Sequence, residues 1–362
     1  MRTERRLSTL LGASAVLALV ACGGVSSGTT SPTPAEDVGS GQLQGAGATF
    51  PEPFYTKAFY AYNQKYSQVS VNYQAIGSGG GIQQFTKGTV DFGASDVPMT
   101  AAEMAAAGVD SALVQVPTII GVEAIAYNLP SVTKLQLDST TLANIFLGTV
   151  KKWNDPAIQS LNSGVSLPGT DITVVHRSDG SGTTFAFTDY LSKVSTDWQA
   201  KVGKGKSVSW PVGVGASGNQ GVGQQVKTTE GAIGYVELAY VIQSQLQHAY
   251  LKNKAGKYLQ ASLDGATAAA GSLSGISPTN FSITDASADK AYPITSYSWA
   301  ILRLDQSDAT KGKAVANLFK WLITDGQQYG KPLDYASLPK EAQDFALSQL
   351  KKLTSGGKPI LS

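Results

Sequence analysis

The chain has 362 residues, a formal net charge of +2, one cysteine and two histidines. Its length suggests about two domains, and the 42% hydrophobic content is typical of a globular protein rather than a disordered one. A nearly neutral chain lacks the dense basic surface that general nucleic-acid binding requires, so we expect no nucleic-acid partner. One cysteine excludes an intrachain disulfide and a multi-cysteine zinc site, and we expect no metal and no cofactor.

The N-terminal residues resemble a secretory leader. Arg2, Arg5 and Arg6 precede an apolar run that is too short to span a bilayer comfortably. Leu19-Val20-Ala21-Cys22 then resembles the bacterial lipobox, in which the cysteine becomes the acylated first residue. We predict a lipoprotein signal peptide over residues 1–21 and lipid attachment at Cys22. The alternatives are an ordinary signal with an incidental cysteine, or a twin-arginine signal, which the following residues fit poorly.

The whole net charge lies in this leader, because residues 1–21 contain three arginines and one glutamate. The mature protein is therefore formally neutral. Residues 22–44 are rich in Gly, Ser, Thr and Pro without periodicity, which predicts a flexible tether. No later segment is typical of a transmembrane helix. The most apolar stretch, residues 112–129, contains Gln115, Pro117 and Glu123, and we expect two buried strands around a turn there.

From residue 45 onward, strand-like and helix-like runs alternate along the chain. The expected elements, in order, are a helix over 54–66, a strand over 70–75, a helix over 81–87, strands over 89–94 and 172–175, a helix over 184–191, a strand over 232–236 and a helix over 314–323. This alternation favours an α/β protein with mainly parallel sheets.

Three segments share one design, in which a strand-like run leads through Gly, Ser or Thr into a helix start. They are residues 45–53, 76–81, where Ser78 is a plausible N-cap, and 177–184, which begins with Arg177. Helix N-termini offer unpaired N–H groups and partial positive charge, so several aimed at one point would bind an anion. A single motif of this kind usually indicates only a capped helix. Three such motifs in one chain, one of which contains an arginine, favour an oxyanion site.

Two acidic residues lie close to these segments in the sequence. Asp96 ends a strand-like run, and a carboxylate beside an anion is repulsive unless the anion has a proton to donate. Phosphate at neutral pH has such a proton and sulfate has none, so Asp96 in the site would select phosphate. Taken alone, Asp96 is more typical of a turn or a cap. Asp179 follows Arg177 by two residues and is expected to pair with it and orient it.

Together these segments resemble the phosphate-binding proteins of bacterial high-affinity phosphate ABC transporters, the PstS family. The resemblance covers the chain from about residue 45 to the C-terminus. Each segment alone is weak evidence for this family, but the combination of all the segments in this order is specific to it. The matching segments are residues 45–51, 76–81, 90–96, 146–148, 152–155, 177–183, 231–237, 292–295 and 333–335.

The resemblance implies a type 2 periplasmic-binding-protein fold with two domains. Domain I would comprise residues 45–127 plus 296–362, and domain II residues 128–295. Two hinge crossings would lie near Asn128 and Pro293, with the ligand cleft between the domains. The implied protein is a lipid-anchored, extracytoplasmic monomer that performs no enzymatic reaction and delivers inorganic phosphate to the permease subunits of an ABC importer.

Matched position by position, the resemblance also implies the phosphate ligands. The expected set is Thr49, Phe50 through its backbone N–H, Ser78, Asp96, Arg177, Ser181, Gly182 and Thr183, with Asp179 orienting the arginine. His176 departs from the family, whose members can carry a second arginine at this position. It would make the cleft rim less basic or sensitive to pH.

Alternative functions from other classes of protein fit the sequence less well. A secreted hydrolase would use Ser181 as nucleophile with His176 or His248 as base, but the segment lacks the first glycine of a GxSxG elbow. A surface adhesin lipoprotein would need no ligand. Residues 213–218 match a dinucleotide-binding GxGxxG, yet no clear strand precedes them, and we reject that interpretation.

Overall fold

The computed structural model describes residues 36–109 and 112–361, and Val38–Ser362 form one compact unit. The predicted signal peptide and Cys22 lie outside the described residues. The first strand begins at Gly41, three residues before the predicted end of the tether at residue 44. Val38 and Leu43 are both buried, and this apolar burial explains why regular structure starts earlier than the small, polar composition indicated.

The strands form one large sheet and two small ones. The large sheet has the order β2-β1-β3-β12-β4-β8-β6-β7, with β9 also pairing with β4; β11, β10 and β5 form a second sheet, and β13 and β14 a hairpin. Their bounds are β1 Gly41–Gly47, β2 Val69–Ala75, β3 Phe92–Ser95, β4 Leu113–Tyr127, β5 Gln136–Leu137, β6 Thr173–Arg177, β7 Val214–Ala216, β8 Ala232–Glu237, β9 Gln247–His248, β10 Tyr250–Lys252, β11 Tyr258–Leu259, β12 Thr295–Arg303, β13 Thr354–Ser355 and β14 Lys358–Pro359.

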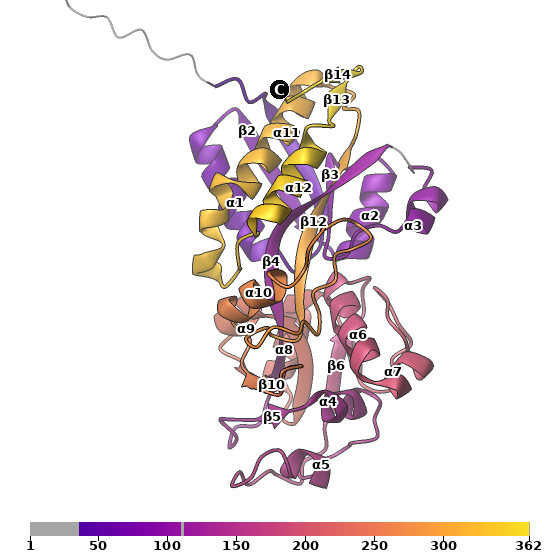
Figure 1. Ribbon diagram of the computed structural model, residues 1–362, viewed down its shortest axis with the longest axis vertical. Coiled ribbons are helices and arrows are strands. Elements are labelled where there is room, and N and C mark those ends of the chain that lie inside the picture. Colours follow the sequence, from indigo (N-terminus) through magenta and orange to yellow (C-terminus); the bar gives the residue numbers. More distant parts are fainter. Residues whose placement is uncertain (1–35, 110–111, 362) are drawn as a thin grey trace, which may run out of the picture. The chain divides into compact units, whose positions relative to one another are not determined.

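Within the large sheet, parallel pairing is confirmed for the outer strands, and β10 also pairs with β5 in parallel in the second sheet. β1 runs parallel to β2 and β3, and β6 runs parallel to β7 and β8. The central strands β4 and β12 are antiparallel to each other, and each is antiparallel to its outer neighbour. The expectation of mainly parallel sheets was therefore wrong at the centre, where two long segments far apart in sequence run side by side (Figure 1).

Strand β4 also corrects the expected pair of strands around a turn. It is one continuous strand of 15 residues, and Pro117 lies inside it. The register against β12 shifts there, because Ser298 opposes Ile119 while Trp299 opposes Pro117, which leaves Thr118 as an extra, bulged residue. A bulge is one of the places where a sheet tolerates proline, since no ladder hydrogen bond is lost there.

The helices expected from the sequence are confirmed, with small shifts of their ends. The helix bounds are α1 Glu52–Lys65, α2 Ser78–Thr86, α3 Ala101–Ala106, α4 Ser139–Phe146, α5 Pro156–Gln159, α6 Gly182–Val194, α7 Thr196–Lys201, α8 Gly218–Thr228, α9 Leu238–Gln243, α10 Leu263–Ala270, α11 Ala309–Ile323 and α12 Lys340–Leu350, with 3₁₀ helices η1 Asp325–Tyr329 and η2 Lys331–Leu333.

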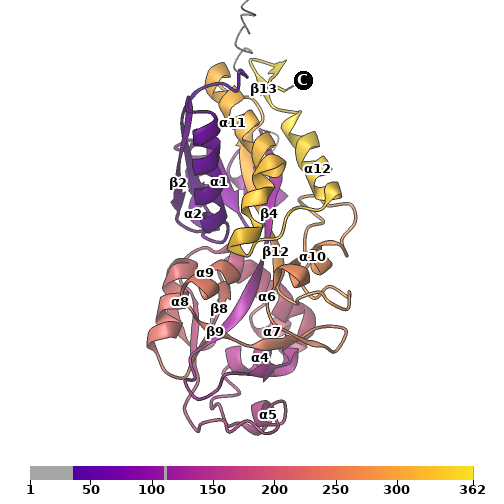
Figure 2. The ribbon, with the colours of Figure 1, turned by 90° about the vertical axis from the view of Figure 1, so that its left-hand side faces the viewer.

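The helices cover the large sheet in two groups (Figures 1 and 2). Helices α1, α2 and α11 pack on β1–β3, whereas α6 and α8 pack on β6 and β8. The buried core runs through both groups and includes the fully buried Trp153, Trp198 and Trp299. Among residues 36–109 and 112–361, no helix combines the length and apolar character needed to cross a membrane.

Candidate functional site

The three segments singled out in the sequence meet in one buried cluster. Thr49 follows β1, Asp96 follows β3, and Arg177 is the last residue of β6, so all three lie at carboxyl ends of parallel strands. Ser78 begins α2 and Ser181 is the N-cap of α6. None of these side chains is more than 7% exposed. Strand ends followed by helix starts are the usual ligand-binding edge of α/β sheets.

Ser78 links the two helix groups, although it is not the N-cap that we expected. Gly77 holds the N-cap position with φ of 86°, and Ser78 is the first helical residue. Its hydroxyl is therefore free to face the cluster. Ser78 Oγ accepts hydrogen bonds from the backbone N–H of Asp96 (3.3 Å) and of Gly182 (3.0 Å), and it lies 3.5 Å from Asp96 Oδ2.

The backbone of α6 approaches this serine closely because residue 182 is glycine. A Cβ atom added to Gly182 would lie 2.5 Å from Asp96 Oδ2 and 2.7 Å from Ser78 Oγ, which no side chain can tolerate. A second bond at the same place joins the Gly79 N–H to the Gly180 carbonyl at 2.8 Å. The start of α2 and the start of α6 are thus in direct contact.

Arg177 supplies the positive charge of the cluster and is held rigidly. Its Nε donates to Asp179 Oδ1 at 2.7 Å, and its Nη2 makes a close contact with Asp179 Oδ2, which confirms the predicted pairing. Nη1 donates to Thr183 Oγ1 at 3.1 Å. Burial alone would raise the pKa of Asp179, but the hydrogen bonds and charge of Arg177 outweigh burial and lower it.

Asp96 is the acidic member of the cluster and is only 1% exposed. Oδ1 accepts a hydrogen bond from Ser298 Oγ at 2.8 Å, and the Asp96 carbonyl accepts one from Ser296 Oγ at 3.1 Å. Burial raises the pKa of this carboxyl to about 7, although Ser298, Arg177 and Ser78 each oppose the shift. Asp96 therefore titrates near neutral pH, rather than remaining an ordinary carboxylate as the sequence suggested.

Thr49 and Phe50 complete the predicted set. Thr49 Oγ1 accepts hydrogen bonds from the backbone N–H of Asn219 (3.2 Å) and from its Nδ2 (2.9 Å). The Thr49 carbonyl accepts one from Tyr240 at 2.6 Å. Phe50 is fully buried, and its carbonyl accepts a hydrogen bond from the Tyr335 hydroxyl.

Asn219 and Ser298 belong to the cluster but were missed by sequence reasoning. Asn219 is fully buried near the start of α8, directly after the short strand β7. No strand precedes residues 213–218, as expected, because β7 lies within this range. The pattern of the other three segments, a strand followed by small residues and a helix start, recurs from β7 to the start of α8. This pattern was the sequence signal that could have identified Asn219. Nothing local marked Ser298, because only the pairing of β12 with β3 brings it to Asp96.

The residues of the hydrolase alternative are not brought together. Ser181 Oγ accepts a hydrogen bond from the Thr184 N–H, as an N-cap does, and Asp179 is engaged by Arg177. His176 Nδ1 lies 3.0 Å from the Arg177 carbonyl, and its ring stacks on Trp210 with a centroid distance of 4.7 Å. Burial lowers the pKa of His176, which keeps it neutral at physiological pH.

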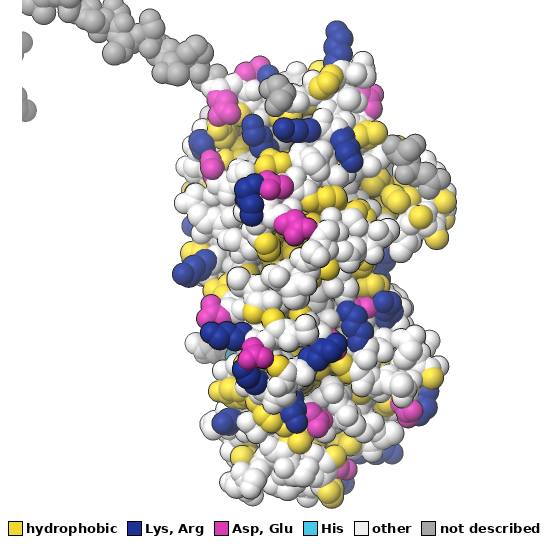
Figure 3. Space-filling model, in the orientation of Figure 1, with side chains coloured by type: hydrophobic (Ala, Val, Ile, Leu, Met, Phe, Trp, Pro, Cys, Tyr) yellow, Lys and Arg dark blue, Asp and Glu magenta, His cyan; other side chains and the backbone are white. Residues whose placement is uncertain are grey.

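Charged side chains of both signs are mixed on the visible surface. On the face shown in Figure 3, Lys and Arg side chains are interspersed with Asp and Glu. Within the described ranges, no group of three or more His, Cys, Asp and Glu side chains could hold a metal ion.

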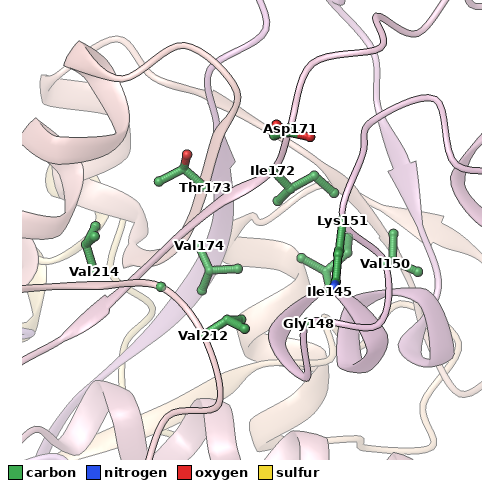
Figure 4. A pocket seen from close by; sticks show the side chains of 11 residues that line it. Ile145, Gly148, Val150, Lys151, Asp171, Ile172, Thr173, Val174, Val212 and Val214 are labelled. Atoms are coloured by element: carbon green, nitrogen blue, oxygen red, sulfur yellow. The ribbon is translucent and has the colours of Figure 1, made fainter.

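A separate pocket lies at the opposite, amino ends of β6 and β7 (Figure 4). Its lining is mostly aliphatic, with Val174, Val212 and Val214 facing Ile145 and Ile172, and it contains none of the predicted site residues. The buried polar cluster is therefore the candidate binding site, and it contains Arg177 with its partner Asp179, several hydroxyls and the buried acid Asp96.

Comparison with known proteins assigns the chain to a family. A family model described as a PBP superfamily domain matches residues 32–325, which assigns the chain to that class of binding proteins. Curated relatives include the phosphate-binding protein PstS of Pasteurella multocida, 47% identical over 88% of this chain and 93% of the relative. The PstS protein of Xylella fastidiosa is 44% identical over 89% of both chains. The chain belongs to the PstS family of phosphate-binding proteins.

A solved structure supports the fold. The phosphate-binding protein from Stenotrophomonas maltophilia superposes with a TM-score of 0.65 over 85% of this chain and 94% of that chain, at 18% identity. The expected α/β periplasmic-binding-protein architecture is thus confirmed.

Proposed function

We propose that this protein is an extracytoplasmic receptor that binds inorganic phosphate and delivers it to the permease of an ABC importer. The observation that carries the proposal is the buried cluster that brings Arg177 and several hydroxyls together with Asp96. The membership of the chain in the PstS family supports the same conclusion. Binding, rather than a reaction, is the function.

The proposed ligands act together in a site closed off from water. Arg177 provides charge in a fixed orientation, because Asp179 holds two of its nitrogens. Hydroxyl and backbone N–H donors surround the anion, while Asp96 Oδ2 exchanges a proton with it. The proposed set is Thr49, Phe50, Ser78, Asp96, Arg177, Ser181, Gly182 and Thr183.

We also propose that residues 45–127 plus 296–362 and residues 128–295 move as two domains about crossings near Asn128 and Pro293. β4 changes its partner from β12 to β8 between Val122 and Glu123, close to the first crossing. Ser78 with Gly182, Thr49 with Asn219, and the ion pair of Lys206 with Glu103 would then join one domain to the other. An anion that adds contacts to both domains shifts the population toward this closed form.

Calorimetric titration of the purified soluble body with phosphate, arsenate and sulfate tests the function. We expect saturable binding of phosphate and arsenate, which both carry a proton near neutral pH, and much weaker binding of sulfate at about pH 8. Absence of phosphate binding would contradict the proposal. Hydrolysis of an ester substrate that is lost in Ser181→Ala would instead support the hydrolase.

Lipid anchoring at Cys22 is a further part of the proposal. Acylated Cys22 would hold a monomeric receptor at the outer face of the cell membrane, beside the permease. We expect Cys22→Ala to release the protein from the membrane fraction, because the described body has no helix suited to replace the anchor. Fractionation and immunoblotting measure this, and membrane retention of the variant would count against lipidation.

A further inference from the structure

The amide of Asn219 is held in one orientation by the sheet. Its Oδ1 accepts a hydrogen bond from the backbone N–H of Glu237, the last residue of β8, at 2.9 Å. A backbone N–H can only donate, so the acceptor beside it must be the amide oxygen. The Nδ2 group is therefore directed to the other side, toward the cluster.

Both protons of Nδ2 go to threonine hydroxyls. Asn219 Nδ2 lies 2.9 Å from Thr49 Oγ1 and 3.2 Å from Thr183 Oγ1. An amide nitrogen has two protons to donate, so this group has none left for a ligand. Asn219 acts on the neighbouring hydroxyls rather than on a bound anion.

The existing hydrogen bonds restrict the direction in which the two threonine hydroxyls can donate their protons. A hydroxyl has two lone pairs and one proton. Thr49 Oγ1 already accepts from the backbone N–H and from Nδ2 of Asn219, and Thr183 Oγ1 accepts from Nδ2 and from Arg177 Nη1. Among the described residues, none accepts a hydrogen bond from either hydroxyl, so each proton is available as a donor.

We propose that Asn219 is a positioning residue that turns the hydroxyl protons of Thr49 and Thr183 toward the bound anion. This inference rests on the proposed function and explains how two hydroxyls that could equally accept hydrogen bonds serve as donors only. The two threonine hydroxyls and Arg177 then all donate hydrogen bonds to the anion, and Asp96 is the group that accepts the proton of the anion. An oxyanion that accepts hydrogen bonds at Thr49 and Thr183 and donates its one proton to Asp96 suits such a site, whereas a ligand that must donate at Thr49 or Thr183 does not.

Phosphate titrations of Asn219 variants test the inference. Asn219→Ala frees both hydroxyls to rotate, and we expect about 10- to 100-fold weaker phosphate binding, the range for hydrogen bonds to a charged group. Asn219→Asp keeps the shape but accepts where the amide donated, so it draws both hydroxyl protons away and adds negative charge. We expect a larger loss from Asn219→Asp than from Asn219→Ala.

A double-mutant cycle separates positioning from a purely structural role. If Asn219 acts through the two hydroxyls, then adding Asn219→Ala to the Thr49→Val/Thr183→Val variant costs no more than about twofold in affinity. Asn162→Ala is the matched control, because Asn162 is also buried and its side chain makes three hydrogen bonds to backbone, none of them in the cluster. We expect it to lower the melting temperature and leave phosphate affinity unchanged.

The outcomes are distinct. Near wild-type affinity in Asn219→Ala and Asn219→Asp, or losses that add fully to those of the valine variant, would overturn the inference while phosphate binding by the wild type stands. A wild-type protein that binds no phosphate would overturn the proposed function and the inference with it.

Discussion

Arg177→Ala is expected to weaken phosphate binding roughly 30- to 4,000-fold, equivalent to about 2–5 kcal/mol for truncating one member of a buried charge pair. Two effects combine. The anion loses its single buried guanidinium, which is 3% exposed, and the Asp179 carboxylate is left without its bidentate partner beside the site. Calorimetry at constant pH and ionic strength measures the loss.

Three further variants test why Arg177→Ala weakens phosphate binding. Arg177→Ala/Asp179→Asn removes the stranded carboxylate and should recover part of the affinity. Arg177→Lys keeps the charge but not the planar fork, so we expect an intermediate loss. Arg303→Ala is the matched control, because this partly buried arginine donates to the Phe85 carbonyl outside the cluster and should leave binding unchanged. Affinity within about twofold of wild type for Arg177→Ala would exclude the arginine from the site.

Asp96 should make sulfate binding depend on pH. Sulfate has no proton for a carboxylate, so it can bind only when Asp96 is protonated. A group with a pKa of about 7 is roughly 3% protonated at about pH 8.5 and 97% at about pH 5.5, which predicts about 30-fold tighter sulfate binding at the lower pH. Phosphate brings its own proton above pH 7, and its affinity should change much less.

Asp96→Asn is expected to remove this pH dependence. The amide can donate to sulfate at every pH, while its oxygen can still accept from Ser298, so phosphate-over-sulfate discrimination at about pH 8.5 should fall by at least roughly tenfold. Asp189→Asn is the matched control: Asp189 is equally buried, but it pairs with Lys193 and Lys204 away from the cluster. Discrimination that persists in Asp96→Asn would remove Asp96 from the selection of the anion.

The segments that form the cluster were recognised from features contained in short stretches of chain, whereas the individual phosphate ligands were implied by the family resemblance. Helix starts after Gly, Ser and Thr are local, and so is the pairing of Arg177 with Asp179 two residues later. The same local signal at residues 216–219 was passed over, because residues 213–218 were compared only with a nucleotide-binding motif. The break expected near Pro117 was wrong for a different reason: a bulge that depends on β12 accommodates the proline.

By itself, the sequence determined the charge balance, the order of most strands and helices, and the segments that form the cluster. These properties depend on neighbouring residues and on spacing within a few turns of chain. Only the tertiary structure decided that Asn219 contacts two threonine hydroxyls, that Ser298 reaches Asp96, and that burial raises the pKa of Asp96 to about 7. Hydrogen-bond polarity and loss of solvation depend on which distant segments surround a group, and no local pattern contains that information.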